Sequence, residues 1–277
     1  MTKLLLIPNK NTLNLNADAL LLGIKNLSVN MPTYFTLDEI KDIMNKTNKE
    51  IFISLNKNMH STDLNLLTNT LIELNNLNIK GVLFYDIGVL NIVNKLKLNI
   101  DLIWGQEHLT TNYQTINFWH KKGTKYTLIS PEISLNEITN IKNNTESKLI
   151  VPVIGYIPMF VSKRHLVENY LKQFDLKDKS KINYIEKEGK IYPIIDEEVT
   201  TVYTNAYLNI TKEITKLKEI NIEYLLINSL LIEDENMEKI INILNNTPEQ
   251  TKEKIDKILN NNTDTFFLNK ETIYKVK

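Results

Sequence analysis

Eight short apolar runs, separated by stretches with helical spacing, limit the folds open to this 277-residue chain more than any other feature. The runs are nearly continuous rather than alternating, as expected for parallel strands that are covered on both faces. They are Lys3–Ile7, Ala19–Leu22, Ile51–Leu55, Val82–Tyr85, Leu102–Trp104, Tyr126–Ile129, Leu149–Ile154 and Tyr224–Ile227. Eight such strands with helices between them predict an α/β fold, the (β/α)8 TIM-type barrel.

The stretches between the runs carry helix signals. Thr36 precedes an amphipathic stretch and has an acidic residue three positions on, the pattern of a capping box. Stretches that begin at Ser61 and Asn209 also repeat apolar residues at helical spacing. A doubly wound open sheet is the main rival fold. No glycine-rich fingerprint follows the first run, so dinucleotide binding has little support.

Two segments depart from the alternation. The connection Pro8–Asp18 is too short for a full crossover helix, which predicts a reduced first helix. Two alternating runs within Ile182–Ile195 predict a small β-hairpin, inserted after strand seven and packed near the carboxyl face. We therefore expect residues 1–247 to form the barrel domain with an insertion over residues 175–207. Residues 248–277 are expected to add a C-terminal helix and tail that pack on the barrel.

The composition excludes several classes of function. Thirty-three basic residues balance 33 acidic ones, so contact with a polyanion such as a nucleic acid needs a local patch or a partner. The chain has no cysteine, which excludes disulfides, thiolate nucleophiles and a cysteine-ligated iron–sulfur cluster bound by this chain. No His cluster has metal-ligand spacing. No segment reaches membrane-spanning length without a charge, and we expect a cytoplasmic protein without membrane contact.

Barrel enzymes carry their reacting groups at the carboxyl ends of the strands. Those ends hold Asn56 and Lys57, Asp86, Gly105–Asn112, Pro131 and Glu132, the stretch from Gly155, and Asn228 and Ser229. Glu107 is the candidate catalytic residue, and with His108 it could supply a general acid or base. The alternative is that Glu107 caps the following helix and that His108 is solvated.

The stretch from Gly155 to Leu171 contains Arg164, the single arginine of the chain. Basic residues in the first turn of a helix oppose its dipole unless an anion neutralises them. The guanidinium fork binds carboxylate or phosphate in a way that lysine cannot reproduce. Ser162, Lys163 and Arg164 are therefore candidate ligand-binding residues. The alternative is a structural helix that Ser162 caps, with Leu166, Val167 and Tyr170 packed inward.

The same stretch, GYIPMFVSKRHLVENYL, is followed by EGKIYPIIDEE and LNITKEITKLKEINIEYLLI, and this order resembles the signature region of the collagenase-like peptidase family, peptidase family U32. LIWGQEHLTTNYQTINFWHKKGTKYTLISPEISLNEI and the ending DTFFLNKETIYKVK resemble the short Gram-positive form of that family. The resemblance therefore covers nearly the whole chain in order.

The resemblance implies a barrel-like catalytic domain. It also implies oxygen-independent hydroxylation of the wobble uridine of tRNA, with prephenate as a co-substrate and a longer cysteine-containing paralogue as partner. Many hydroxylating members hold an iron–sulfur cluster, and a cysteine often lies near a His-Gly motif in this region. Here Pro158 stands about where that cysteine would fall.

We therefore expect a cluster-free member of the family, or a partner subunit, that takes part in this hydroxylation. Lys163 and Arg164 would hold an anionic group, and Glu107 and Asn112 would line the opposite wall. Whether the chain is itself an enzyme stays open. One alternative is a collagenase-like peptidase, a hydrolase, although no nucleophile with an evident base supports it. The other is a non-catalytic binding or scaffold subunit.

Overall fold

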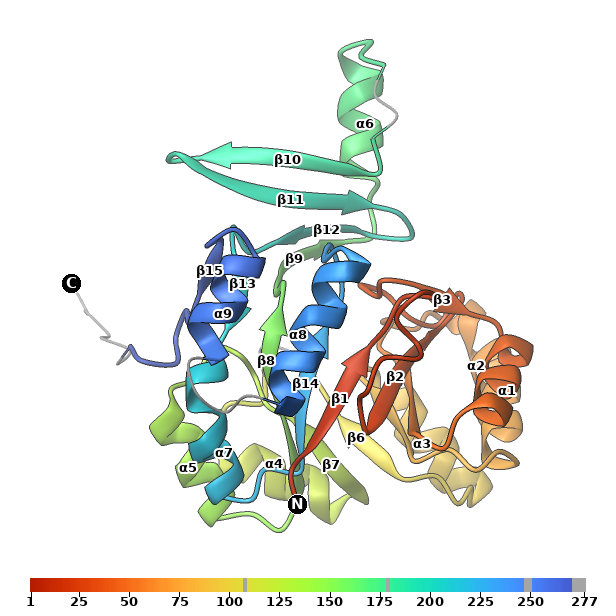
Figure 1. Cartoon of the computed structure of the whole chain (residues 1–277). Helices are drawn as coiled ribbons and strands as arrows, with labels where there is room; N and C mark the ends of the chain where they lie inside the picture. Colours follow the sequence, from red (N-terminus) through yellow and green to blue (C-terminus); the bar gives the residue numbers. More distant parts are fainter. Residues whose placement is uncertain (107–108, 178–179, 247–250, 271–277) are drawn as a thin grey trace, which may run out of the picture.

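Eight parallel strands close on themselves at the centre of the molecule (Figure 1). The computed structural model describes residues 1–106, 109–177, 180–246 and 251–270. Strand β14 pairs with both β1 and β8, and these two pairings close the sheet into a barrel. The predicted (β/α)8 fold and its eight strands are confirmed: β1 (Lys3–Ile7), β2 (Ala19–Ile24), β4 (Glu50–Leu55), β5 (Gly81–Phe84), β6 (Leu102–Trp104), β7 (Thr124–Leu128), β8 (Lys148–Gly155) and β14 (Tyr224–Asn228).

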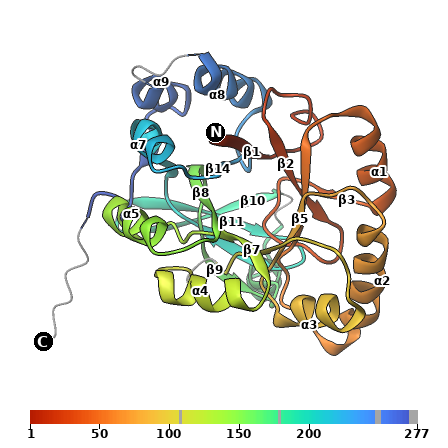
Figure 2. The same ribbon diagram turned by 90° about the horizontal axis from the view of Figure 1, so that it is seen from below.

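Helices surround the barrel, as the view along its axis shows (Figure 2). The capping box at Thr36 and Glu39 starts the first of them, as predicted. Between β1 and β2 the described residues 8–18 form only turns and bends, so the predicted reduction of the first helix is confirmed. The surrounding helices are α1 (Leu37–Lys46), η1 (Ser61–Asp63), α2 (Leu64–Asn75), α3 (Ile87–Leu96), α4 (Tyr113–Lys121), α5 (Leu135–Asn143), η2 (Thr211–Glu213), α7 (Ile214–Glu219), α8 (Asp234–Asn246) and α9 (Thr251–Ile258).

Aromatic side chains fill the barrel interior. The Phe52 ring meets the rings of Tyr126 and Tyr224 edge-on, with centroids 5.5 and 5.2 Å apart. Such edge-to-face contacts add to the burial of apolar area. A larger core lies between the strands and the helices and includes Leu6, Leu20 and many other buried side chains.

Ion pairs close the amino end of the barrel. The Glu50 carboxylate lies 2.9 Å from Lys3 Nζ and 2.7 Å from Lys80 Nζ, and it accepts a 2.6 Å hydrogen bond from Tyr224 Oη. Burial raises the pKa of Glu50, but the hydrogen bonds from Lys80, Tyr224 and Lys3 outweigh it and hold the pKa at about 2. Asp101–Lys125 (2.5 Å) and Lys148–Glu223 (3.3 Å) pair at neighbouring strands.

A second sheet lies above the carboxyl ends of the barrel strands (Figure 1). Its antiparallel order is β10-β11-β12-β9, and it carries the predicted hairpin as β10 and β11, with a turn at Glu188 and Gly189. The chain leaves the barrel at Pro158, earlier than the predicted start at residue 175. The elements of this insertion, residues 158–203, are β9 (Pro158–Ser162), α6 (Leu166–Gln173), β10 (Ile182–Lys187), β11 (Lys190–Asp196) and β12 (Thr200–Tyr203).

Three short strands complete the sheets. β3 (Tyr34–Phe35) pairs with β2. β13 (Tyr207–Asn209) pairs with β8 and with β15 (Thr263–Asp264), which brings the C-terminal part of the chain against the barrel. The buried side chain of Ile255 anchors α9 there.

Candidate functional site at the barrel mouth

The loop that follows β2 forms one side of the barrel mouth, and buried polar side chains hold it. Ser28 Oγ accepts a hydrogen bond from Ile24 N (2.7 Å) and donates to the Ser54 carbonyl (2.5 Å). Asn56 Oδ1 accepts from Val29 N (3.0 Å), and its Nδ2 donates to the Val29 carbonyl (2.9 Å). Both backbone groups of Val29 are satisfied in this way, which stabilises the observed position of the loop.

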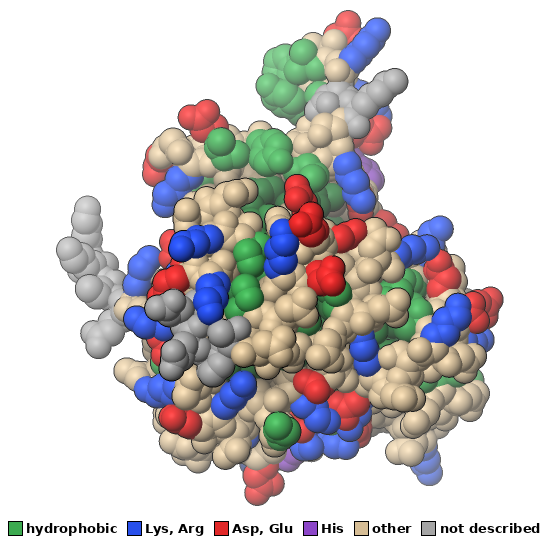
Figure 3. All heavy atoms as spheres, in the orientation of Figure 1, with side chains coloured by type: hydrophobic (Ala, Val, Ile, Leu, Met, Phe, Trp, Pro, Cys, Tyr) green, Lys and Arg blue, Asp and Glu red, His purple; other side chains and the backbone are tan. Residues whose placement is uncertain are grey.

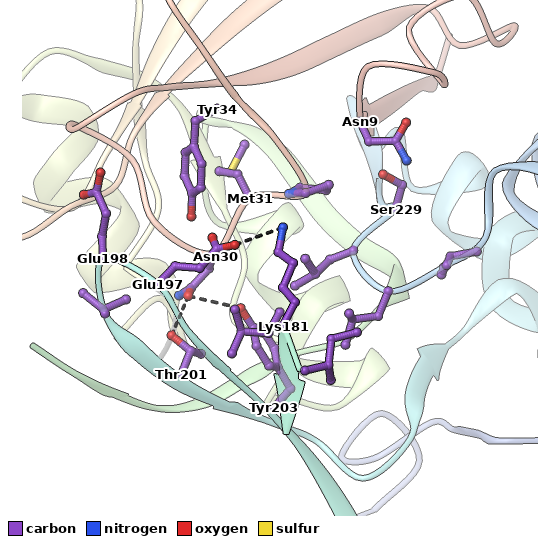
Figure 4. Close-up of a pocket in the computed structure, with 17 residues that line it drawn as sticks. Asn9, Asn30, Met31, Tyr34, Lys181, Glu197, Glu198, Thr201, Tyr203 and Ser229 are labelled. Carbon is purple, nitrogen blue, oxygen red and sulfur yellow. Dashed lines mark hydrogen bonds and ion pairs between the residues drawn. The ribbon is translucent and has the colours of Figure 1, made fainter. Parts of the chain in front are cut away.

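Asn30, the next residue of the loop, joins it to the insertion (Figure 4). Asn30 Oδ1 accepts hydrogen bonds from Thr201 Oγ1 (2.7 Å) and Tyr203 Oη (3.2 Å), both on β12. Its φ of 59° lies in the left-handed region, which asparagine tolerates better than most residues. The insertion is therefore seated directly on the mouth.

An axial cavity of about 90 Å³ lies at the centre of the mouth. Apolar side chains line most of it, and Ser54, Asn56 and Asn228 add hydroxyl and amide groups. Of the described residues that line it, none carries a charge. Gly155 lets β8 approach β14 here, since a Cβ at its φ of 133° would lie 2.7 Å from the Asn228 Cβ. The arrangement suits an uncharged, partly polar ring.

A side cavity of about 160 Å³ separates the mouth from β11 and β12 (Figure 4). The Lys181 ammonium pairs with Glu197 across it at 3.0 Å. Burial is the main cause that raises the pKa of Tyr34 to about 12, so its phenol stays protonated at neutral pH. Among the residues that the structure describes, the buried hydroxyls of Ser229 in this cavity and Ser54 in the axial cavity have no hydrogen-bond partner. Buried hydroxyls without partners are rare, and both belong to residues that line a cavity of the mouth.

An outer cleft of about 330 Å³ lies between β9 and the loops that follow β4, β5 and β6. Its residues include Lys57, Phe160 and Lys163, and the Lys163 Nζ donates to the Asn58 carbonyl at 2.9 Å. All three cavities share Asn30, and the axial cavity and the outer cleft also share Asn56 and Tyr85. They are therefore neighbouring parts of one site.

The structure brings only some of the predicted site residues to this mouth. Lys163 lines the outer cleft. Arg164 follows on the exposed turn between β9 and α6 and lines none of the three cavities. Asn112 caps α4 by accepting a 2.9 Å hydrogen bond from Thr115 N. Glu107 and His108 lie outside the described residues.

The predicted alternative, a helix capped by Ser162 and packed inward, is wrong. Ser162 ends β9, and its Oγ accepts from Arg164 N at 3.1 Å. The start of α6 is instead capped by Asp196 of β11, whose Oδ2 accepts from the Val167 and Glu168 amides at 2.9 and 3.0 Å. The apolar side of α6 is exposed, and Figure 3 shows hydrophobic side chains gathered over this helix, among them Leu166, Tyr170 and Phe174.

Sequence reasoning missed Asn30, Thr201 and Tyr203. Asn56 and Ser229 stand at the carboxyl ends of predicted strands, and this position alone marks them as candidate functional residues. In the described part of the chain no three His, Asp or Glu side chains gather as a metal site requires. Within the same residues no helix is long and apolar enough to cross a bilayer.

Comparison with known proteins gives matches along most of the chain. The model of peptidase family U32 matches residues 9–275. The tRNA hydroxylation protein P2 of Bacillus subtilis is 26% identical over 93% of both chains. The tRNA hydroxylation protein P of Haemophilus influenzae is 24% identical over 46% of this chain and 28% of its own length.

Solved structures resemble the chain only distantly. A glycoside hydrolase family 18 N-acetylglucosaminidase from Paenibacillus barengoltzii has 6% identity and a TM-score of 0.40, over 82% of this chain and 94% of the other. A TM-score this low carries no argument about function.

Proposed function

Because this chain belongs to peptidase family U32, we propose that it takes part in the hydroxylation of the wobble uridine of tRNA in the cytoplasm. The observation that carries the proposal is the match, along 93% of both chains, to a relative named tRNA hydroxylation protein P2. The barrel mouth supports it, because an uncharged axial cavity lined by Ser54 and Asn56 suits a nucleobase better than a charged substrate.

The iron–sulfur cluster that the family resemblance implies does not fit this chain. Cluster irons are held by thiolates, and the chain has no cysteine. Pro158, which stands near the position of the family's cysteine, is the first residue of β9 and lines the axial cavity. The proposal is therefore a cluster-free component that works with a longer cysteine-containing paralogue, with prephenate as co-substrate of the pathway.

The roles of the predicted site residues belong to this proposal. Lys163 and Arg164 hold an anionic group, assisted by Ser162. Glu107 serves as acid or base beside His108, and Asn112 lines the facing wall. The position of Lys163 in the outer cleft supports its part of the assignment.

The test is a deletion strain complemented with the wild-type gene, with the paralogue gene present or absent. Mass spectrometry of tRNA nucleosides measures hydroxylated wobble uridine. Restoration that requires both genes is expected, and no loss of the nucleoside on deletion would overturn the proposal. Arg164→Lys is expected to reduce restoration, because lysine cannot form a bidentate contact.

The peptidase alternative has a separate test. The purified protein is incubated with gelatin and unfolded casein, with Ser54→Ala and Glu107→Ala as controls. Fragments that appear with the wild type and disappear with either variant would establish proteolysis. We expect none.

A further inference from the structure

Three successive apolar residues of β9 are exposed at the outer cleft. Met159, Phe160 and Val161 expose 52%, 51% and 46% of their surface. Successive side chains of a strand point to opposite faces, so both faces of β9 are about half exposed at this point. β9 is also an edge strand, since β12 is its one partner in the four-stranded sheet. The protein thus leaves an aromatic ring and its apolar neighbours open in a cleft of about 330 Å³.

Most of the other residues that line the cleft are polar, and two of them are lysines. Asn58 and Gln106 line it together with Lys57 and Lys163. Lys57 lies 3.6 Å from Asp63 and 3.9 Å from Glu198, so carboxylates already neutralise it. Lys163 donates to the neutral Asn58 carbonyl and has no carboxylate partner among the described residues. One cation of the cleft is therefore available to an anion, beside an exposed ring.

We propose that the outer cleft binds one unpaired nucleotide of RNA, with its base against Phe160 and its phosphate on Lys163. A stacking ring beside a cation is how proteins hold single-stranded nucleic acid. The volume falls within the range of small-molecule sites, about 300–1,000 Å³, which admits a nucleotide and excludes a duplex. The inference rests on the proposed function, and it adds the place and manner of contact with the RNA.

The position of the cleft beside the axial cavity lets the bound nucleotide orient its neighbour in the RNA. The cleft and the axial cavity share Asn56 and Tyr85. A nucleotide held on Phe160 therefore places its neighbour at the entrance of the axial cavity, which Ser54 lines. The cleft holds the nucleotide next to the modified one and orients the modified base.

The experiment measures binding of a fluorescent anticodon stem–loop RNA and of the same strand annealed to its complement. The wild type is expected to bind the stem–loop more tightly than the duplex. Phe160→Ala should weaken stem–loop binding about 5- to 150-fold, whereas Phe160→Trp should preserve it. Lys163→Gln should make the slope of log affinity against log salt shallower by about 0.7, the value for one phosphate contact to a single strand.

Matched controls lie on α4. Phe118 is likewise exposed, and Lys122 Nζ lies 5.6 Å from its ring centroid. Phe118→Ala and Lys122→Gln remove an aromatic ring and a cation outside the mouth. They are expected to leave both affinity and salt slope unchanged.

The outcomes separate this inference from the proposed function. Equal binding of stem–loop and duplex, or wild-type binding by Phe160→Ala and Lys163→Gln, overturns the inference. If the wild type binds no RNA while its gene restores hydroxylation, the cleft assignment fails and the proposed function stands. If casein fragments bind instead and Phe160→Ala abolishes that binding, the cleft is a peptide site. Failure of the wild-type gene to restore hydroxylation counts against the proposed function whatever the RNA measurement shows.

Discussion

The polar groups at the two ends of the barrel differ in the hydrogen-bond and ion-pair partners that they have. At the amino end, Glu50 is shared by two lysines and a tyrosine hydroxyl. At the carboxyl end, the hydroxyls of Ser54 and Ser229 are buried without a partner in the described part of the chain. In barrels of this kind the amino end serves stability and the carboxyl end serves function. Thr124 Oγ1 and Tyr126 Oη are also buried without a hydrogen-bond partner among the described residues, so the contrast lies between the paired carboxylate at one end and the hydroxyls of cavity-lining residues at the other. Four predictions test it.

The largest effect is expected at the amino end. Glu50→Ala leaves Lys3 and Lys80 without their shared carboxylate and Tyr224 Oη without its acceptor. The carboxylate is only half-buried, so the loss of its three charge-assisted hydrogen bonds should lower the free energy of unfolding by about 3–4 kcal/mol. Urea unfolding measures this, with Glu223→Gln as control because Glu223 pairs with one lysine only. An equal loss of stability in the two variants would show that the shared carboxylate of Glu50 stabilises the fold no more than a single ion pair does.

The next effect concerns Asn56, a structural group of the mouth. Asn56→Ala leaves both the N–H and the carbonyl of Val29 unsatisfied. At about 1–3 kcal/mol for each buried group, the loss of stability is about 3 kcal/mol, and the loop with Asn30 is released. Thermal unfolding and wobble hydroxylation should both decline. Asn58→Ala, at an exposed neighbour, should change stability by less than about 0.5 kcal/mol.

Acid should weaken the contacts of Glu50 at the amino end. The pKa of Glu50 in the folded protein is about 2, below its ordinary value of 4.5. The ionised carboxylate therefore stabilises the fold at neutral pH, and this contribution is lost as the pH falls from 4.5 toward 2. It amounts to about 2 kcal/mol once solvent screening of a side chain with 24% exposure is allowed for. Stability curves of wild type and Glu50→Gln should converge over this range, and parallel curves would refute the assignment.

The smallest effect on stability is expected for the hydroxyls of Ser54 and Ser229 at the carboxyl end. Ser54→Ala and Ser229→Ala remove hydroxyls that make no hydrogen bond to described residues. We expect the free energy of unfolding to stay within about 0.5 kcal/mol or to rise, while hydroxylation falls. Ser28→Ala is the matched control, because that hydroxyl makes two hydrogen bonds and its loss should lower stability. Full hydroxylation by both variants would show that neither hydroxyl contacts a substrate.

The barrel could be predicted from the sequence because its strands are covered on both faces. Continuous apolar runs such as Lys3–Ile7 appear at each of the eight positions. The start of the insertion was missed because only Tyr156 and Ile157 separate β8 from β9. The apolar sequence continues from the buried strand β8 into the exposed strand β9, so composition does not mark where the barrel ends and the insertion begins.

The candidate site was less predictable, because it forms where distant segments meet. Asn56 and Ser229 stand at strand ends, where the fold itself directs attention. Asn30 and Thr201 are 171 positions apart, and the bond between them depends on how the insertion sits on the loop after β2. The sequence favoured Arg164 for its rarity, whereas the structure places Lys163 in the cleft.

The closure of the barrel constrains how the protein is made. Leu5 of β1 pairs with Leu226 of β14, so β1 lacks one neighbour until β14 has been synthesised. A nascent chain on the ribosome therefore carries an open sheet whose edges can pair with another chain. The insertion emerges before β14 and seats on the loop after β2 through Asn30. Chaperone contact during translation is accordingly expected to end when β14 emerges and both edges are joined.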